Sequence, residues 1–353
     1  MKVLTLYDKS GPKYWRCLLP LFLMDGIELI VNHKIEEDQL PGVDIVFINR
    51  IVPNSTLQTV LDLRERYGFK LIIDYDDHWY LDRDHYLYDT YQHFRASELM
   101  EAYITEADAV TVTHDRLRDE VLPLNKNVYI LPNAVPVFDQ FTAKKTDSPL
   151  TRIFWAGGVT HKKDIQLLTN PVKRFPPEVM MVMGGYVNGN PEYLSMASAF
   201  TNGGKIKHRL IDSLPVDKYY YAYSECDIAV IPLRDTRFNS FKSNLKILEA
   251  ANIAAPVIVS DVHPYKDFPF VKYVRSQSDW YKWVKWCLDN RDEAAQMGRD
   301  LQAYCREHYN FEQINSERKK VFEYVTKEQG KAGAVPGQVQ HADSRPNPEP
   351  ATA

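Results

Sequence analysis

The sequence predicts an α/β protein in which two doubly wound parallel sheets, one in each half of the chain, face a central cleft. Short apolar runs rich in β-branched residues recur along the chain, longer amphipathic stretches separate them, and a polar segment with three prolines interrupts the series at residues 132–149. Runs of about four to six apolar residues are typical of buried parallel strands, and their alternation with helices is typical of doubly wound sheets. A length of 353 residues fits roughly two domains.

The first half, residues 1–136, carries one complete series. Its helical patterns are clearest at 57–67 and 98–106, where apolar side chains recur on one face. The expected strands are 2–6, 27–31, 44–48, 70–74, 109–113 and 128–131.

The second half, residues 150–309, repeats the series. The expected strands are 152–156, 179–183, 207–210, 228–232, 256–260 and 272–274, with helical patterns at 216–224, 244–252, 279–289 and 293–309. We interpret residues 137–149 as a linker. Residues 327–353 are rich in Pro, Gly and Ala and have few large apolar side chains, so we expect this tail to be disordered.

Composition and charge limit the classes of function. The formal net charge is −4, which argues against binding nucleic acid by bulk charge but allows a local basic groove. None of the four cysteines forms a C-x-x-C pair, and their wide spacing does not suggest zinc. The apolar run at residues 3–6 is too short for a signal peptide, and the run at 18–24 carries Pro20 and is too short to span a bilayer. We therefore expect a reduced, soluble, cytoplasmic protein without an integral membrane segment.

Ligands of open α/β sheets bind beyond the carboxyl ends of the strands, and the strand expected at 228–232 ends in a polar segment of this kind. Lys242, Ser243 and Asn244 open the helix that follows, and Lys246 and Glu249 share one of its faces. Free amides at a helix start attract anions, and a lysine adds charge, so the segment suggests a nucleotide diphosphate with Glu249 accepting from ribose hydroxyls. The alternative is a capped helix whose lysine and glutamate form a solvated surface pair.

The stretch FNSFKSNLKILEAANIAAPVIVSDVHPY resembles the donor-binding segment of GT-B glycosyltransferases, close to glycosyltransferase family 4. Glu249 matches the second glutamate of the family motif, and residues 256–260 match the strand after it. The first glutamate, which the family uses for sugar hydroxyls, falls on Phe241. The segment is more similar to a branch with Phe-Asn and Lys-Ser-x-x-Lys, which here are Phe238–Asn239 and Lys242–Ser243 with Lys246.

A second match lies in RIFWAGGVTHKKDIQLL, at the start of the expected donor domain. Gly157 matches the glycine of the family's turn, Gly158 stands where the family has an arginine, and Lys163 matches the lysine that touches the diphosphate. A glycine pair also allows close approach of the backbone to a ligand, and His161 can add a donor. By itself the pair is equally consistent with an ordinary strand-to-helix turn.

Further features agree in their order along the chain. Gly11 follows the first strand, where the family has a glycine-rich turn facing the cleft, and Arg16 could reach a phosphate or be an ordinary exposed side chain. ADAVTVT at 107–113 and Leu-Pro-Asn at 131–133 resemble the end of the family's acceptor domain. The resemblance also implies that a closing helix at about 310–326 packs back on the first domain.

KLIIDYDDHWY ends the strand expected at 70–74 with an acidic cluster. Asp74, Asp76 and Asp77 could hold a divalent metal, as in metal-dependent GT-A glycosyltransferases. Alternatively, Asp76 and Asp77 line the acceptor side of the cleft and orient hydroxyls while His78 assists proton transfer, or an aspartate caps the next helix. We favour the acceptor side, with Asp76, Asp77 and His78 catalytic and no metal site.

The resemblance implies a two-domain GT-B glycosyltransferase whose second Rossmann-like domain binds a nucleotide-diphosphate sugar and whose first binds an acceptor hydroxyl. It also implies retention of anomeric configuration and no obligatory metal or other cofactor. Polysaccharide, lipid-linked sugar, protein or a modified DNA base all suit the acceptor. A non-catalytic nucleotide-sugar-binding protein of the same fold is the alternative, because Phe241 replaces a family glutamate.

Overall fold

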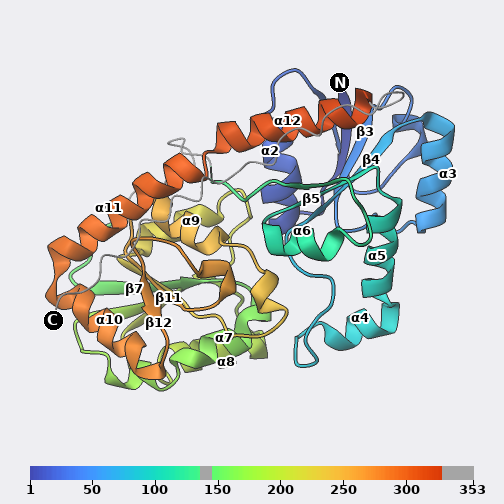
Figure 1. The fold of residues 1–353 in the computed structure, drawn as a ribbon. Coiled ribbons are helices and arrows are strands. Elements are labelled where there is room, and N and C mark those ends of the chain that lie inside the picture. Colours follow the sequence, from blue (N-terminus) through green and yellow to red (C-terminus); the bar gives the residue numbers. More distant parts are fainter. Residues whose placement is uncertain (136–144, 328–353) are drawn as a thin grey trace.

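Each half of the chain folds around a six-stranded parallel sheet in the computed structural model, which describes residues 1–135 and 145–327. Figure 1 shows the two lobes, with the first in blue to teal and the second in green to orange. The predicted α/β architecture with two Rossmann-like doubly wound domains is confirmed. Most of the linker expected at 137–149, and all but Lys327 of the tail expected at 327–353, lie outside the described residues.

The strands of the first sheet are arranged in the order β2-β1-β3-β4-β5-β6. Their bounds are β1 Lys2–Leu6, β2 Glu28–Asn32, β3 Ile45–Asn49, β4 Lys70–Tyr75, β5 Ala109–Val112 and β6 Val128–Ile130. The helices are α1 Gly11–Lys13, a π-helical turn Tyr14–Leu18, α2 Leu19–Phe22, α3 Leu57–Tyr67, α4 Tyr88–Phe94, α5 Ala96–Glu106 and α6 Asp115–Val121. The order reverses between β1 and β3, which is the point where such sheets bind ligands.

The second sheet has the order β12-β11-β10-β7-β8-β9, and it reverses between β7 and β10. Its strands are β7 Thr151–Ala156, β8 Val179–Tyr186, β9 His208–Asp212, β10 Ile228–Ile231, β11 Val257–Ser260 and β12 Lys272–Val274. The helices are α7 Lys162–Ile165, α8 Pro191–Phe200, α9 Leu245–Asn252, α10 Gln277–Asp289, α11 Arg291–His308 and α12 Phe311–Lys327.

Two segments of the second domain differ from the expectation. The helix expected at 216–224 is a 3₁₀ helix over Tyr219–Glu225, a segment that carries four tyrosines and buries Tyr223. Helix α8 was not expected, although its start has a recognisable signal: Asn190 accepts from the amide of Glu192, and Pro191 occupies the first turn.

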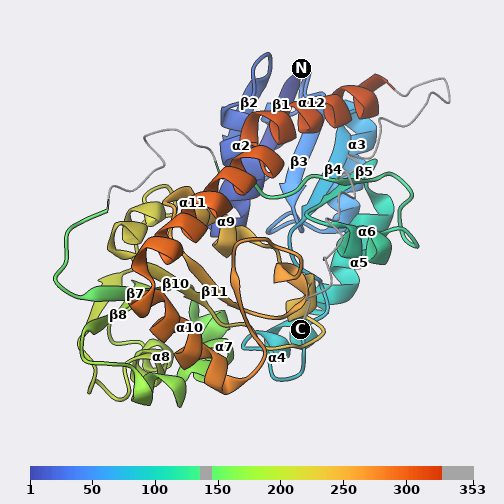
Figure 2. The same ribbon diagram turned by 60° about the vertical axis from the view of Figure 1, so that its left-hand side comes forward.

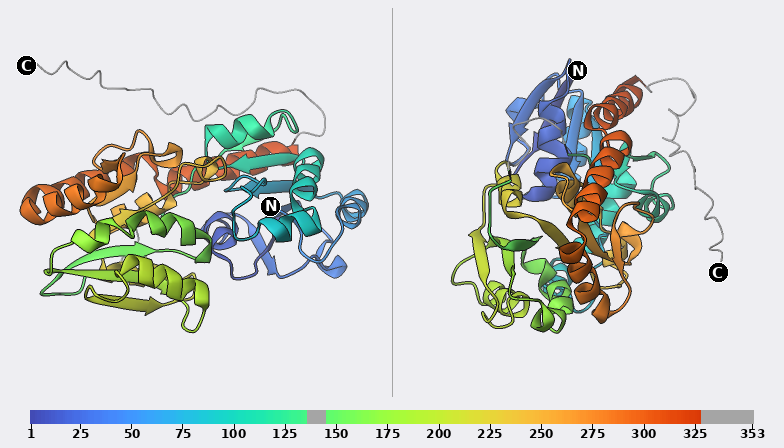
Figure 3. Two further views of the ribbon diagram at one scale, coloured as in Figure 1. Left: turned by 90° about the horizontal axis from the view of Figure 1, so that it is seen from below. Right: turned by 90° about the vertical axis from the view of Figure 1, so that its left-hand side faces the viewer.

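Helix α12 leaves the second domain and covers the first sheet. Figure 2 shows it in red beside β1 and α2, and Figure 3 shows the two lobes side by side with α12 against the first. Phe322 is fully buried with its ring 5.1 Å from that of Phe47, and Asn315 donates to the carbonyl of Pro20. Burying such an aromatic side chain stabilises the contact by roughly 1.5–3 kcal/mol.

Over residues 1–135 and 145–327, no helix is both long enough and apolar enough to cross a bilayer. The four cysteines are free and buried.

Candidate active site between the two domains

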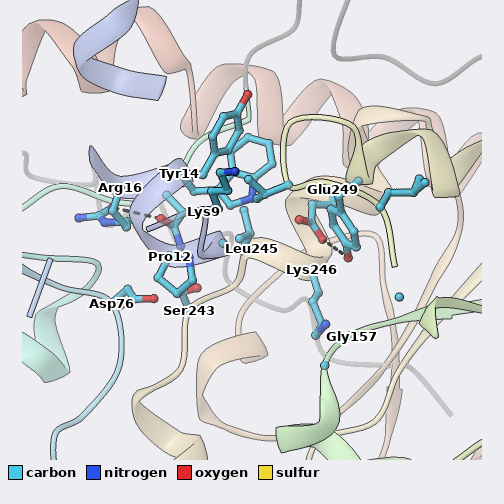
Figure 4. A pocket seen from close by; sticks show the side chains of 18 of the residues that line it. Lys9, Pro12, Tyr14, Arg16, Asp76, Gly157, Ser243, Leu245, Lys246 and Glu249 are labelled. Atoms are coloured by element: carbon cyan, nitrogen blue, oxygen red, sulfur yellow. Dashed lines mark hydrogen bonds between the residues drawn. The ribbon is translucent and has the colours of Figure 1, made fainter. Parts of the chain in front are cut away.

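A cavity of about 1000 Å³ lies between the domains, where the carboxyl ends of both sheets face each other. Its walls come from the loop after β1, the end of β4, the turn after β7 and the start of α9 (Figure 4). The structure brings most of the predicted residues to this cavity, namely Gly11, Arg16, Asp76, Asp77, Gly157, Gly158, His161, Lys242, Ser243, Lys246 and Glu249. Other expected residues, namely His78, Lys163, Asn239 and Asn244, do not line it.

The start of α9 presents a positively charged wall. Lys242 is mostly buried, with its ammonium 4.7 Å from the centre of the Phe238 ring and 3.9 Å from a carboxylate oxygen of Asp77. In the described chain, the amides of Leu245 and Lys246 have no hydrogen-bond partner, as expected in the first turn of a helix. Lysine charge and free amides together form an anion site.

Lys246 extends from α9 to the turn after β7. Its ammonium donates to the carbonyl of Ala156 over 2.5 Å and lies 5.7 Å from the centre of the Trp155 ring. Burial, together with the nearby charge of Lys242, lowers the pKa of Lys246. Lys246 is the second lysine of this wall of the cavity, and Figure 4 shows its side chain pointing toward Gly157.

Gly157 is a glycine because Lys246 and Trp155 occupy the space of a side chain. A Cβ there would lie 2.9 Å from the Trp155 ring and 3.0 Å from the Lys246 ammonium. We expect Gly157→Ala to lower the free energy of unfolding by about 1–3 kcal/mol, the usual cost of overpacking, in urea denaturation. Gly158→Ala is the matched control, since its Cβ would meet nothing closer than 3.9 Å. Equal losses in the two variants would contradict this reading of the turn.

Two tyrosines hold the carboxylate of Glu249, which follows Lys246 by three residues on α9. The hydroxyls of Tyr223 and Tyr219 donate to its Oε2 over 2.8 and 3.3 Å, which leaves Oε1 without a partner among the described residues. Burial raises the pKa of Glu249, although Lys246 opposes the shift. The carboxylate is thus oriented as a fixed acceptor one turn below the anion site.

His161 and Asp164 form a pair at the start of α7. The Nδ1 atom of His161 lies 2.9 Å from Oδ2 of Asp164, while the backbone amide of Arg234 and the side chain of Asn239 donate to Oδ1, each over 3.0 Å. Asn239 therefore anchors the loop behind the cavity wall instead of facing a ligand. Burial and the charge of Lys246 lower the pKa of His161 to about 4.

Asp76 and Asp77 face these groups from the first domain. Both accept from the guanidinium of Arg50, over 3.2 and 3.1 Å. Burial would raise the pKa of Asp77, but the charges of Lys242 and Arg50 outweigh it and lower the value. An ionised carboxylate therefore faces the lysines across the cavity.

The predictions for Arg16 as a phosphate-binding residue and for Asp74 as a metal ligand are wrong, because these two side chains bind each other. Two hydrogen bonds of 3.0 and 2.7 Å join the guanidinium to the carboxylate, and both side chains are at most 1% exposed. Arg16 also donates to Asn133 and to the carbonyl of Leu131, so its donors are directed into the protein and not toward a phosphate. Asp74 in turn is not a third ligand beside Asp76 and Asp77, and no metal-binding group of three such side chains occurs within 1–135 and 145–327.

The remaining predicted residues serve elsewhere. Lys163 pairs with Asp84 over 2.9 Å in a neighbouring groove, so the matching of this lysine to the cavity is wrong. His78 is buried, its ring stacked on Trp79 and 4.4 Å from that of Phe241, which removes it from proton transfer in the cavity. Asn244 is the residue before α9, and its side chain hydrogen-bonds Tyr309.

Sequence reasoning missed several residues of the cavity. Lys9, Tyr14 and Tyr193 line it beside Tyr219. Lys9 lies three residues after the end of β1, with a left-handed backbone at φ of 65°. The dense tyrosines at 219–223 were a signal in the sequence that one wall of the cavity is aromatic.

Residues 166–317 match the family model described as glycosyl transferase-like. The second domain is a group 1 glycosyltransferase domain. The whole chain has the GT-B fold, because its two facing Rossmann-like sheets match solved GT-B structures over more than nine-tenths of its length. The enzyme class expected from the sequence, a glycosyltransferase, is confirmed.

Solved structures share this fold at low sequence identity. HepE from Anabaena matches with a TM-score of 0.65 and 12% identity over 92% of this chain and 100% of HepE. A glycosyltransferase from Rickettsia africae matches with a TM-score of 0.62 and 12% identity, covering 93% of this chain and 99% of the other. An α-glucosyltransferase solved with UDP and DNA matches with a TM-score of 0.63 and 10% identity, covering 92% of this chain and 99% of the other. No curated protein matches the sequence.

Proposed function

We propose that this glycosyltransferase moves a sugar from a UDP-sugar to an acceptor hydroxyl, with the diphosphate bound at the start of α9. One observation carries the proposal. Lys242, Lys246 and the free amides of α9 lie together in the cavity, next to the place where the strand order of the second sheet reverses. HepE has been solved with UDP and with UDP-glucose, which supports uridine as the base.

The chemistry follows from charge. As the bond between sugar and diphosphate breaks, negative charge grows on the leaving oxygen, and the lysines and amides are already positioned to stabilise it. Glu249 accepts from the ribose through Oε1, because its other oxygen is held by tyrosines. Asp76 and Asp77 orient the acceptor hydroxyl from the first domain. We propose that transfer retains the anomeric configuration and has no obligatory metal, with these side chains giving the charge stabilisation.

The lysine at the start of α9 tests this site. We expect Lys242→Ala to weaken UDP binding about 10- to 100-fold in calorimetry, since a hydrogen bond to a charged group contributes roughly 1.5–3 kcal/mol. Lys163→Ala is the control: its ammonium is bound to Asp84 outside the cavity, and UDP affinity should change less than twofold. Equal weakening in both variants would place the diphosphate elsewhere.

Turnover separates catalysis from mere binding. A panel of UDP-sugars should include one that the protein consumes with release of UDP. A chain that binds UDP with Lys242-dependent affinity, yet releases no UDP from any sugar in the presence of hydroxyl acceptors, would support the non-catalytic alternative.

A further inference from the structure

We propose that His161, held by Asp164 as a neutral imidazole with its proton on Nδ1, is a specificity-determining residue that accepts a hydrogen bond from a hydroxyl of the donor sugar through Nε2. The inference rests on the proposed function and refines it. It assigns His161 an acceptor role, the reverse of the donor role expected from the sequence.

The partners of Asp164 determine where the imidazole proton lies. One carboxylate oxygen receives the amide N–H of Arg234 and the side-chain N–H of Asn239, which are donors only. The other oxygen lies 2.9 Å from Nδ1 of His161. Asp164 is 3% exposed, and although burial raises the pKa of a carboxyl, the hydrogen bond from His161 and the surrounding donors lower that of Asp164. An ionised Asp164 can only accept, so Nδ1 of His161 carries a proton.

The surroundings of the ring determine whether the second nitrogen, Nε2, is also protonated. Burial disfavours an imidazolium at this place, and the charges of Lys246 and Lys242 add to it, so that together they outweigh the opposite effect of Asp164 and lower the pKa of His161. Near neutral pH the ring therefore carries one proton, on Nδ1, and Nε2 keeps its lone pair. Nδ1 is turned to the buried Asp164, whereas the residue lines the cavity, so Nε2 is the ring nitrogen available to a ligand.

The unprotonated Nε2 of His161 can only accept a hydrogen bond, so it favours a ligand atom that donates one. Facing a phosphate oxygen, Nε2 would place one acceptor against another, which is unfavourable. A sugar hydroxyl donates and satisfies it. The carboxylate of Asp77, whose pKa is lowered by the charges of Lys242 and Arg50 against the effect of burial, lines the same cavity. An acceptor on the cavity wall, close to the lysines of the anion site, therefore fits a hydroxyl group of the donor sugar.

Imidazole ¹⁵N spectra of the full-length protein test the protonation state directly. With His161→Gln used for assignment, we expect His161 to show a protonated Nδ1 and an unprotonated Nε2 from pH 6 to 8, with and without UDP. Calorimetry of UDP binding in two buffers of different ionisation enthalpy should show no proton uptake that depends on His161. An imidazolium in the UDP complex, or uptake of about one proton that His161→Gln abolishes, would overturn the inference.

Binding of UDP and UDP-glucose by variants tests the ligand. His161→Gln and His161→Ala should change UDP affinity less than twofold and weaken UDP-glucose about three- to tenfold, the effect of one lost hydrogen bond. His208→Gln on the exposed edge strand β9 is the control and should change neither. Equal loss for UDP and UDP-glucose would contradict the sugar assignment while leaving the proposed function intact. Absence of UDP binding in the unaltered protein would instead remove the proposed function, and this inference with it.

Discussion

Arg16→Met is expected to destabilise the protein by roughly 3–5 kcal/mol, because it leaves the buried carboxylate of Asp74 without its cation. Asp74 is 0% exposed and receives Arg16 through two hydrogen bonds. The hydroxyl of Thr111 and the amide of Asn49 remain as donors, but neither carries charge. The loss should appear as a lower denaturation midpoint in urea at neutral pH.

The effect should also reach the active site. Arg16 donates to Asn133, and Asn133 donates to the hydroxyl of Ser243 at the start of α9 over 2.8 Å. A single chain of hydrogen bonds thus connects the core of the first domain to the proposed diphosphate site. We expect the variant to bind UDP more weakly even under conditions where it stays folded.

Arg318→Met is the matched control for this prediction. Arg318 is also buried, at 3% exposure, but its Nε has no partner among the described residues. Burial and the charge of Arg16 lower the pKa of Arg318 to about 9. Removing a poorly compensated buried charge should leave the free energy of unfolding unchanged or raise it. If both variants lost the same stability, loss of packing rather than of charge would explain the effect.

Phe241→Ala is expected to open the cleft. Phe241 belongs to the second domain, yet it is 1% exposed and packs within the core cluster of the first, 4.4 Å from the His78 ring and 4.7 Å from the guanidinium of Arg116. Its carbonyl also lies 3.0 Å from Nε2 of His114. Truncating such a side chain costs roughly 3–5 kcal/mol. Because Phe241 joins the two domains, the substitution should destabilise the closed arrangement of the domains relative to an open one.

Small-angle scattering should show a larger radius of gyration for Phe241→Ala, and turnover should fall because the cavity walls separate. Phe22→Ala removes a ring that is 75% exposed, so scattering, stability and turnover should remain as in the unaltered chain. An unchanged radius of gyration together with a large loss of stability would mean that Phe241 supports the first domain alone.

This contact gives a physical reason for the departure from the family motif. Phe241 stands where the family places a glutamate, and its side chain lies against the first domain and not in the cavity. A carboxylate in that aromatic setting would lose its hydration, whereas a ring gains stacking and cation–π contacts.

Local patterns in the sequence were sufficient for the architecture. The sequence predicted a strand at the place of every strand of both sheets, and a central strand such as β10, which is buried at every residue, is recognisable as an unbroken apolar run. Gly157, Lys242, Lys246 and Glu249 could be placed at one site because parallel strands bring their carboxyl ends to one edge.

Partners distant in the sequence could not be inferred in the same way. The sequence alone determined the two doubly wound domains and the residue types at their strand ends. Tertiary structure decided which charges face the cavity: Arg16 turned inward to Asp74, Lys163 turned away to Asp84, and Lys246 took its place. The reason is that a charged side chain is directed by the nearest opposite charge or free dipole in space, and that neighbour is set by packing between elements rather than by spacing along the chain.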